Sequence, residues 1–130
     1  MSKNKILITG SAGFIGFHFT KNLLDNGFEV LGIDNLNDYY DPQLKQARLA
    51  ILEPYDNFTF GKVDIANRDQ FNVISSSFNP EKIVHFAAQA GVRYSIDNPY
   101  AYMSSNLTGF LNILEFCRHY NVEGLIYASS

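Results

Sequence analysis

Short apolar runs alternate along the chain with segments of helical periodicity. Residues 5–9 (Lys-Ile-Leu-Ile-Thr) are apolar and β-branched, which is typical of a strand buried on both faces. Similar runs predict strands at 28–33, 58–63, 82–86 and 125–128. Between them, apolar residues recur at helical spacing and predict helices over 14–27, 42–52 and 67–78, and from 99 to about 119.

This alternation predicts a doubly wound α/β fold of the Rossmann type. Parallel strands need a crossover long enough to hold a helix, so we expect a parallel sheet in the order 3-2-1-4-5 with helices on both faces. No linker or low-complexity tract interrupts the pattern, and residues 1–130 are predicted to form one domain. Ligands of such sheets bind beyond the carboxyl ends of the strands, here between strands one and four.

Three glycines separate the first predicted strand from the first helix. Gly10, Gly13 and Gly16 stand in the run Gly-Ser-Ala-Gly-Phe-Ile-Gly. Glycine lets the backbone approach a ligand closely, and the positive end of the helix can receive a pyrophosphate. A tight turn without a ligand would also explain a lone triplet of glycines.

An aspartate follows the second predicted strand at the spacing expected for a dinucleotide site. Asp34 lies 18 residues beyond Gly16. There it can accept hydrogen bonds from both hydroxyls of the adenosine ribose and would repel a 2'-phosphate, which favours NAD over NADP. A turn or helix-cap aspartate is the alternative. Together with the glycines, Asp34 predicts NAD binding.

Small and polar residues also follow the third and fourth strands. Asp64 either faces the adenine or only closes a turn. Ala87 and Ala88 would leave room for a dinucleotide, although packing of strand against helix would explain them too. Arg93 lies near the expected nicotinamide end, where its guanidinium could pair with a phosphate or carboxylate or simply face solvent.

Histidine and cysteine residues show no metal or catalytic pattern. His85 lies within an apolar strand and is interpreted as a core histidine bonded to a backbone group. His18, His119 and Cys117 have no partners at metal or catalytic spacing. No metal site is predicted.

Composition narrows the classes of partner. Hydrophobic residues make up 46% of the chain, charged residues 18%, and the net charge is -3. This is globular composition without a basic footprint, so neither a nucleic acid nor a membrane surface is expected to bind. No apolar run approaches the roughly 20 residues that cross a bilayer, and a single cysteine forms no internal disulfide. We therefore expect a cytoplasmic protein.

Taken together, these motifs resemble the extended short-chain dehydrogenases, and among them the nucleotide-sugar epimerases and dehydratases. The resemblance spans the whole chain. The most specific strings are Asn-Leu-Asn-Asp-Tyr-Tyr-Asp at 35–41 and Ala-Ala-Gln-Ala-Gly-Val-Arg-Tyr-Ser at 87–95, which look like UDP-glucuronate 4-epimerases. Asp-Ile at 64–65, Ser-Asn at 105–106 and Tyr-Ala-Ser-Ser at 127–130 fit the same group.

The resemblance implies roles for individual residues. Ser130 would be the active-site serine or threonine that hydrogen-bonds the sugar oxygen during hydride transfer. The residues implied to contact NAD are Gly10, Gly13, Phe14, Ile15, Asp34, Asn35, Asp64, Ile65, Ala87, Ala88, Gln89 and Asn106.

The resemblance also implies a mechanism. In the family, the tyrosine of a Tyr-x-x-x-Lys motif removes a hydroxyl proton, hydride moves from C4 of the sugar to NAD, and the rotated keto-sugar receives it back on its other face. The lysine lowers the pKa of the tyrosine, so that the phenolate acts as base. No tyrosine of this chain has a lysine four residues later. We therefore expect that residues 1–130 lack the rest of the cofactor domain and the substrate domain, and do not turn over alone.

The reading with the strongest support is an NAD-dependent epimerase of polysaccharide biosynthesis that acts on a UDP-sugar, UDP-glucuronate above others. Two alternatives remain. One is another NAD-dependent nucleotide-sugar epimerase or dehydratase, and the other is a non-catalytic, NAD-responsive module. A homodimer is compatible with the resemblance, because family members commonly pair through helices that include the one after Pro99.

Overall fold

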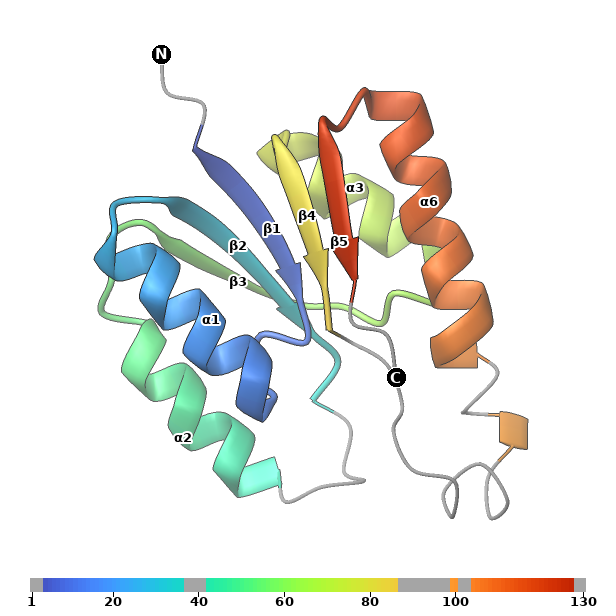
Figure 1. The fold of residues 1–130 in the computed structure, drawn as a ribbon. Helices are drawn as coiled ribbons and strands as arrows, with labels where there is room; N and C mark the ends of the chain where they lie inside the picture. The colour runs from blue at the N-terminus through green and yellow to red at the C-terminus, as the bar shows by residue number, and fades with distance from the viewer. Residues whose placement is uncertain (1–3, 37–41, 87–98, 101–103, 128–130) are drawn as a thin grey trace.

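The structure is a computed structural model that describes residues 4–36, 42–86, 99–100 and 104–127. Strands and helices alternate along these residues (Figure 1). In chain order the elements are β1 (Lys5–Thr9), α1 (Phe14–Asp25), β2 (Glu29–Asp34), α2 (Pro42–Leu52), β3 (Phe58–Lys62), α3 (Arg68–Phe78), β4 (Lys82–His85), the π-helical turn η1 (Ser104–Thr108), α6 (Gly109–Tyr120) and β5 (Gly124–Tyr127).

All five strands are parallel and form one sheet in the order β3-β2-β1-β4-β5. The predicted fold class and strand order are confirmed, and each strand lies within one residue of its predicted range. β1 is central and pairs with both β2 and β4. The order therefore reverses between β1 and β4, which is where a ligand of such a sheet is expected.

Helices cover both faces of the sheet, α1 and α2 on one side and α3 and α6 on the other (Figure 1). Side chains of β1 alternate between the two layers, because successive residues of a strand point to opposite faces. Ile6 and Ile8 pack in the α1–α2 layer, and Leu7 packs in the α3–α6 layer. Each layer thus has its own buried apolar cluster.

The predicted helix from Pro99 to about His119 is not one regular α-helix in the described residues. Residues 104–108 form a π-helical turn, and the α-helix α6 begins at Gly109. The change of pitch comes directly before the point where α6 meets the segment that follows β3: a Cβ atom on Gly109 would lie 2.5 Å from Cγ1 of Ile65. Close packing at Gly109 accompanies the local irregularity.

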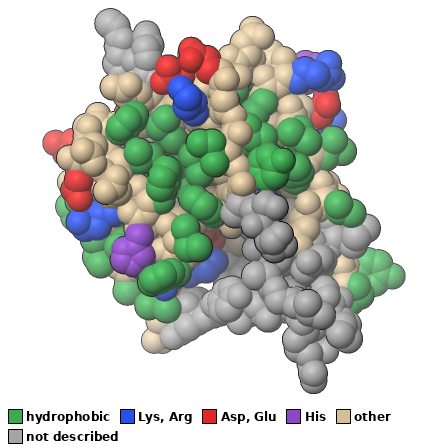
Figure 2. Space-filling model, in the orientation of Figure 1, with side chains coloured by type: hydrophobic (Ala, Val, Ile, Leu, Met, Phe, Trp, Pro, Cys, Tyr) green, Lys and Arg blue, Asp and Glu red, His purple; other side chains and the backbone are tan. Residues whose placement is uncertain are grey.

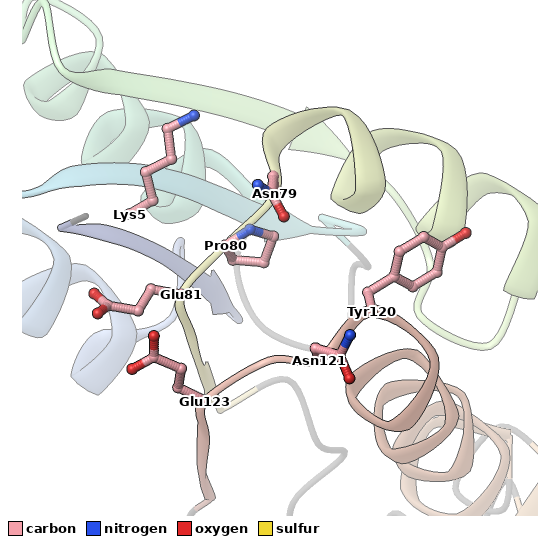
Figure 3. A pocket seen from close by; sticks show the side chains of 7 residues that line it. All are labelled: Lys5, Asn79, Pro80, Glu81, Tyr120, Asn121 and Glu123. Carbon is pink, nitrogen blue, oxygen red and sulfur yellow. The ribbon is translucent and has the colours of Figure 1, made fainter. Parts of the chain in front are cut away.

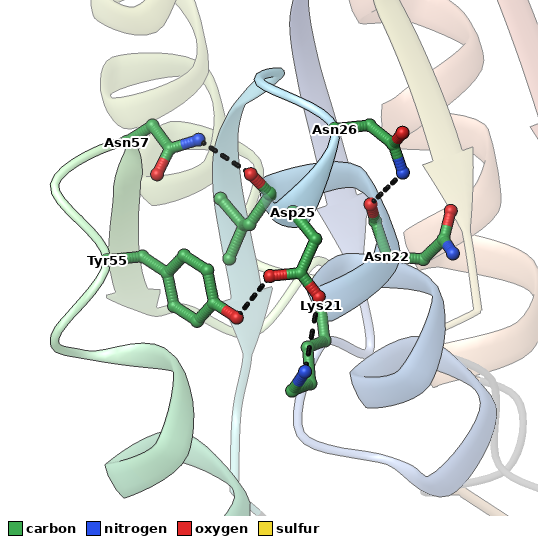
Figure 4. Close-up of polar contacts among 7 residues, drawn as sticks. Lys21, Asn22, Asp25, Asn26, Tyr55 and Asn57 are labelled. Carbon is green, nitrogen blue, oxygen red and sulfur yellow. Dashed lines mark hydrogen bonds and ion pairs between the residues drawn. The ribbon is translucent and has the colours of Figure 1, made fainter.

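A polar cluster fastens the end of α1 to the segment between α2 and β3 (Figure 4). The hydroxyl of Tyr55 and the ammonium of Lys21 both donate to the carboxylate of Asp25. These two contacts, the Tyr55 hydrogen bond above all, lower the pKa of Asp25. Asn57 adds donations to the carbonyls of Leu24 and Phe28. The cluster is partly exposed and structural, and it lies away from the carboxyl ends of the strands.

One part of the surface is rich in hydrophobic side chains. Ile126 and Tyr127 of the outer strand β5 are exposed, as is Phe19 of α1. Figure 2 shows hydrophobic side chains gathered over the part of the face where β4 and β5 lie beside α1.

No helix in the described part of the chain is long and apolar enough to cross a membrane.

Candidate functional site

The loop between β1 and α1 is a tight turn fastened to β2. Gly10 has a positive φ of 76°, which glycine adopts without strain. The amides of Gly10 and Ser11 both donate to the carbonyl of Ile33, at 2.7 and 3.3 Å. A Cβ on Gly16 would lie 2.0 Å from the oxygen of Gly10, so only glycine lets α1 approach the loop this closely.

The start of α1 is open to an anion. Its N-cap, Gly13, makes no side-chain capping bond, and the first turn has no acidic residue. The first amides of a helix lack partners within it and carry the positive end of the helix dipole. Phe14 and Ile15 are 66% and 62% exposed there. The structure thus brings together five of the predicted residues, from Gly10 to Gly16, in a geometry that fits a phosphate group.

Asp34 lies next to this loop and is only 3% exposed. Its Oδ2 accepts from the amide of Ala12 at 3.1 Å, and its Oδ1 accepts from the amide of Leu36 at 2.8 Å. The bond to Leu36, two residues on, is the turn role considered from the sequence. A carboxylate has about four lone-pair sites; Lys45 takes a third at Oδ1, which leaves room at Oδ2 for a hydrogen bond from a ribose hydroxyl.

Two basic residues of α2 meet the same site and were missed in the sequence. Lys45 forms an ion pair with Oδ1 of Asp34 at 3.1 Å, and its side chain is 11% exposed. Arg48 donates to the carbonyl of Ala12 at 3.0 Å, and its guanidinium carbon lies 5.8 Å from the centre of the Phe14 ring. Asp34 accepts a hydrogen bond from the amide of Ala12, and Arg48 donates one to its carbonyl. Side chains of β2 and α2 therefore hold the glycine loop in place. Their spacing of three on a helix was the available signal.

At the end of β3 the structure combines a turn with close helix packing. Asp64 is exposed, and its Oδ1 accepts from the amide of Ala66, so it has the turn role that was one of its two alternatives. Ile65 is buried, and its carbonyl accepts from the side chain of Asn112 at 2.8 Å. Asn112 was not singled out in the sequence. An adenine contact by Asp64 and Ile65 stays a prediction.

The end of β4 is joined to β1 through side chains. His85 is 6% exposed, as expected of a core histidine, but its partner is not a backbone group: Nδ1 lies 2.7 Å from the hydroxyl of Thr9. The same hydroxyl accepts from the amide of Phe86 at 3.0 Å. The Thr9 hydroxyl therefore bonds both the imidazole of His85 and the backbone of Phe86, so the ends of β1 and β4 are joined where the sheet order reverses.

Burial lowers the pKa of His85 to about 4. The unfolded state, with an ordinary histidine pKa near 6.5, then binds more protons between these values, so stability falls as the pH drops from about 6.5 to about 4. We expect His85 to account for a loss of about 2 kcal/mol between pH 7.5 and pH 5. Urea unfolding at both pH values, with His85→Gln as comparison, measures this. An equal loss in the variant would contradict the assignment.

The remaining predicted site residues lie either beside β2 and in the π-helical turn or outside the described residues. Asn35 directly follows β2, and Asn106 lies in the π-helical turn. The other predicted site residues lie outside the described residues; they are Ala87, Ala88, Gln89, Arg93 and Ser130. Among described residues, no group of three or more histidine, cysteine or acidic side chains could hold a metal ion.

A cavity of about 310 Å³ lies at the opposite edge of the sheet, where β1, β4 and β5 begin (Figure 3). The C-terminal ends of α3 and α6 meet there, and negative helix ends disfavour an anion. Two carboxylates add to that charge, so this cavity does not suit a dinucleotide. Its lining residues are Lys5, Asn79, Pro80, Glu81, Tyr120, Asn121 and Glu123.

Comparison with known proteins gives consistent matches. The family model described as GDP-mannose 4,6 dehydratase matches residues 7–130. Protein CapI of Staphylococcus aureus is 53% identical over 126 residues, which cover 97% of this chain and 37% of that protein. A UDP-glucuronate 4-epimerase of Thermodesulfobacterium geofontis is 45% identical over 124 residues, covering 95% of this chain and 38% of that protein.

A solved structure agrees over the same extent. It is a UDP-glucuronic acid 4-epimerase variant from Bacillus cereus, in complex with NAD and a fluorinated UDP-glucuronic acid. The TM-score is 0.86 at 33% identity, with coverage of 97% of this chain and 40% of that one. The chain thus spans well under half the length of these relatives. Since the family model matches nearly all of it, the chain belongs to the GDP-mannose 4,6-dehydratase family of NAD-dependent nucleotide-sugar epimerases and dehydratases.

Proposed function

We propose that this chain is the NAD-binding portion of a nucleotide-sugar 4-epimerase that interconverts UDP-glucuronate and UDP-galacturonate. The observation that carries the proposal is the junction of three features at one sheet edge: the open start of α1, the tight Gly10–Gly16 turn and the buried carboxylate of Asp34. Together they fit a pyrophosphate and an adjoining ribose. Similarity to UDP-glucuronate 4-epimerases supports the choice of sugar.

The residues of this chain would bind and orient the cofactor. The first amides of α1 would face the pyrophosphate, and Asp34 would accept from the ribose hydroxyls. Thr9 and His85 would hold the ends of β1 and β4 at the crossing point between them. Bound NAD would supply a hydride acceptor for C4 of the sugar.

The proposal extends to residues that the structure does not describe. Ser130 would hydrogen-bond the sugar oxygen, Arg93 would bind a charged group of the substrate, and Ala87, Ala88 and Gln89 would line the path of NAD. The tyrosine and lysine of the acid–base motif would follow in the longer protein. In this proposal the enzyme works in the cytoplasm, as a homodimer.

The test is a proton NMR time course of the full-length protein with UDP-glucuronate and no added cofactor. We expect a mixture of UDP-glucuronate and UDP-galacturonate, produced by NAD that remains bound through each turnover. Residues 1–130 alone, run beside it, are expected to give no product because they lack a Tyr-x-x-x-Lys pair. No conversion by the full-length protein, with or without NAD, would refute this substrate. Conversion of a different nucleotide sugar would place the reaction elsewhere in the family.

A further inference from the structure

The adenosine end of the proposed site carries more positive than negative charge among the described side chains. Asp34 contributes one carboxylate, and the exposed Asp64, which follows β3, contributes a second. Lys45 lies 3.1 Å from it, and Arg48 lies on the adjoining Ala12 carbonyl. Lys62 is the register partner of Asp34 on β3, and its side chain is exposed. An acidic residue at the end of the second strand is therefore not the only charge that a ribose substituent would meet.

The ion pair changes what Asp34 can exclude. An unpaired carboxylate repels a phosphate on the ribose 2' oxygen, which is the usual basis of selection for NAD. Here Lys45 offsets that charge at close range and in a largely buried setting, where screening by salt is weak. The Asp34 contact uses one of the three donors of an ammonium, so Lys45 can also donate to a phosphate oxygen.

Arg48 adds a second cation that is held in place. Its bond to Ala12 and its position over Phe14 fix the guanidinium beside the glycine loop. Guanidinium groups near the ribose are the usual means of binding a 2'-phosphate. We propose that Lys45 and Arg48 form a 2'-phosphate subsite which Asp34 masks, so that these cations and Asp34 together set the ratio of NADP affinity to NAD affinity.

This inference rests on the proposed NAD site, and the test separates the two. Dissociation constants for NAD and NADP are measured by calorimetry on nucleotide-free, full-length protein. Asp34→Asn is expected to improve NADP affinity relative to NAD by about tenfold or more, because it removes the masking charge. Lys45→Met is expected to worsen it by about tenfold, and in Asp34→Asn/Lys45→Met most of the gain from Asp34→Asn should be lost.

Lys82→Met is the matched control. It removes one positive charge from an exposed lysine at the beginning of β4, on the opposite edge of the sheet, and should leave the ratio unchanged. If Lys45→Met proves unfolded by circular dichroism, Arg48→Met decides, with the same expected direction. A folded variant with an unchanged ratio overturns the inference while NAD binding stands. If the wild-type protein binds neither dinucleotide, the proposed function itself fails.

Discussion

Replacing Gly16 by alanine is expected to destabilise the fold by about 3 kcal/mol, the upper end of the usual range for overpacking, and to abolish NAD binding. The added Cβ would lie 2.0 Å from the oxygen of Gly10 and 2.8 Å from its carbonyl carbon. Both are backbone atoms, so no side chain can rotate to make room. Either α1 or the loop must move, and the loop is held by Ile33, Asp34 and Arg48. Urea unfolding and calorimetric titration with NAD measure the two effects.

Gly13→Ala is the control for this substitution. A Cβ at Gly13 would lie 3.4 Å from the oxygen of Gly10, and the φ of Gly13 is -75°, which alanine adopts readily. Its stability should stay within about 1 kcal/mol of the wild-type value. If the Gly16→Ala variant is as stable as the Gly13→Ala variant, the close approach of α1 to the loop described above is contradicted.

Truncating Phe116 to alanine is expected to lower the free energy of unfolding by about 3–5 kcal/mol. Phe116 lies on α6 and is 1% exposed. The centre of its ring lies 5.4 Å from that of Phe71 on α3, in an edge-on contact, and 4.5 Å from that of Tyr120, on which it stacks. The substitution would open a cavity in the layer that joins α6 to the sheet. Denaturant unfolding followed by circular dichroism gives the value.

Leu114→Ala tests whether burial causes that loss. Leu114 lies on the same helix but is 42% exposed, so its truncation should cost about 0.5 kcal/mol or less. Similar losses for Phe116→Ala and Leu114→Ala would contradict the packing of α6 described above.

The sheet could be predicted because its determinants are local. Residues 5–9 and 82–86 both contain apolar, β-branched residues, and the helical stretches between strands favour parallel pairing of those strands. The π-helical turn at 104–108 was missed for the opposite reason. It accompanies the packing of Gly109 against Ile65, a residue more than 40 positions earlier, and helical periodicity carries no information on such a contact.

The arrangement of the candidate site could be predicted in part for the same reason. The spacing of Gly10, Gly16 and Asp34 follows from one strand–helix–strand unit, so a local motif locates it. Lys45 and Arg48 reach that unit only because α2 packs beside α1 and the loop. The partner of His85 depends on the pairing of β1 with β4, so the sequence indicated a buried histidine but not a hydroxyl partner.

The position of β1 in the middle of the sheet also has a consequence for the order of folding. Lys5 pairs with Glu29, 24 positions later, whereas Ile6 pairs with Lys82, 76 positions later. The longer loop costs only about 1 kcal/mol more to close, but distant contacts form more slowly than near ones. During synthesis β1 and β2 can therefore pair well before β4 leaves the ribosome. The junction of β1 with β4 is completed late, and a ligand bound there stabilises the last contacts to form.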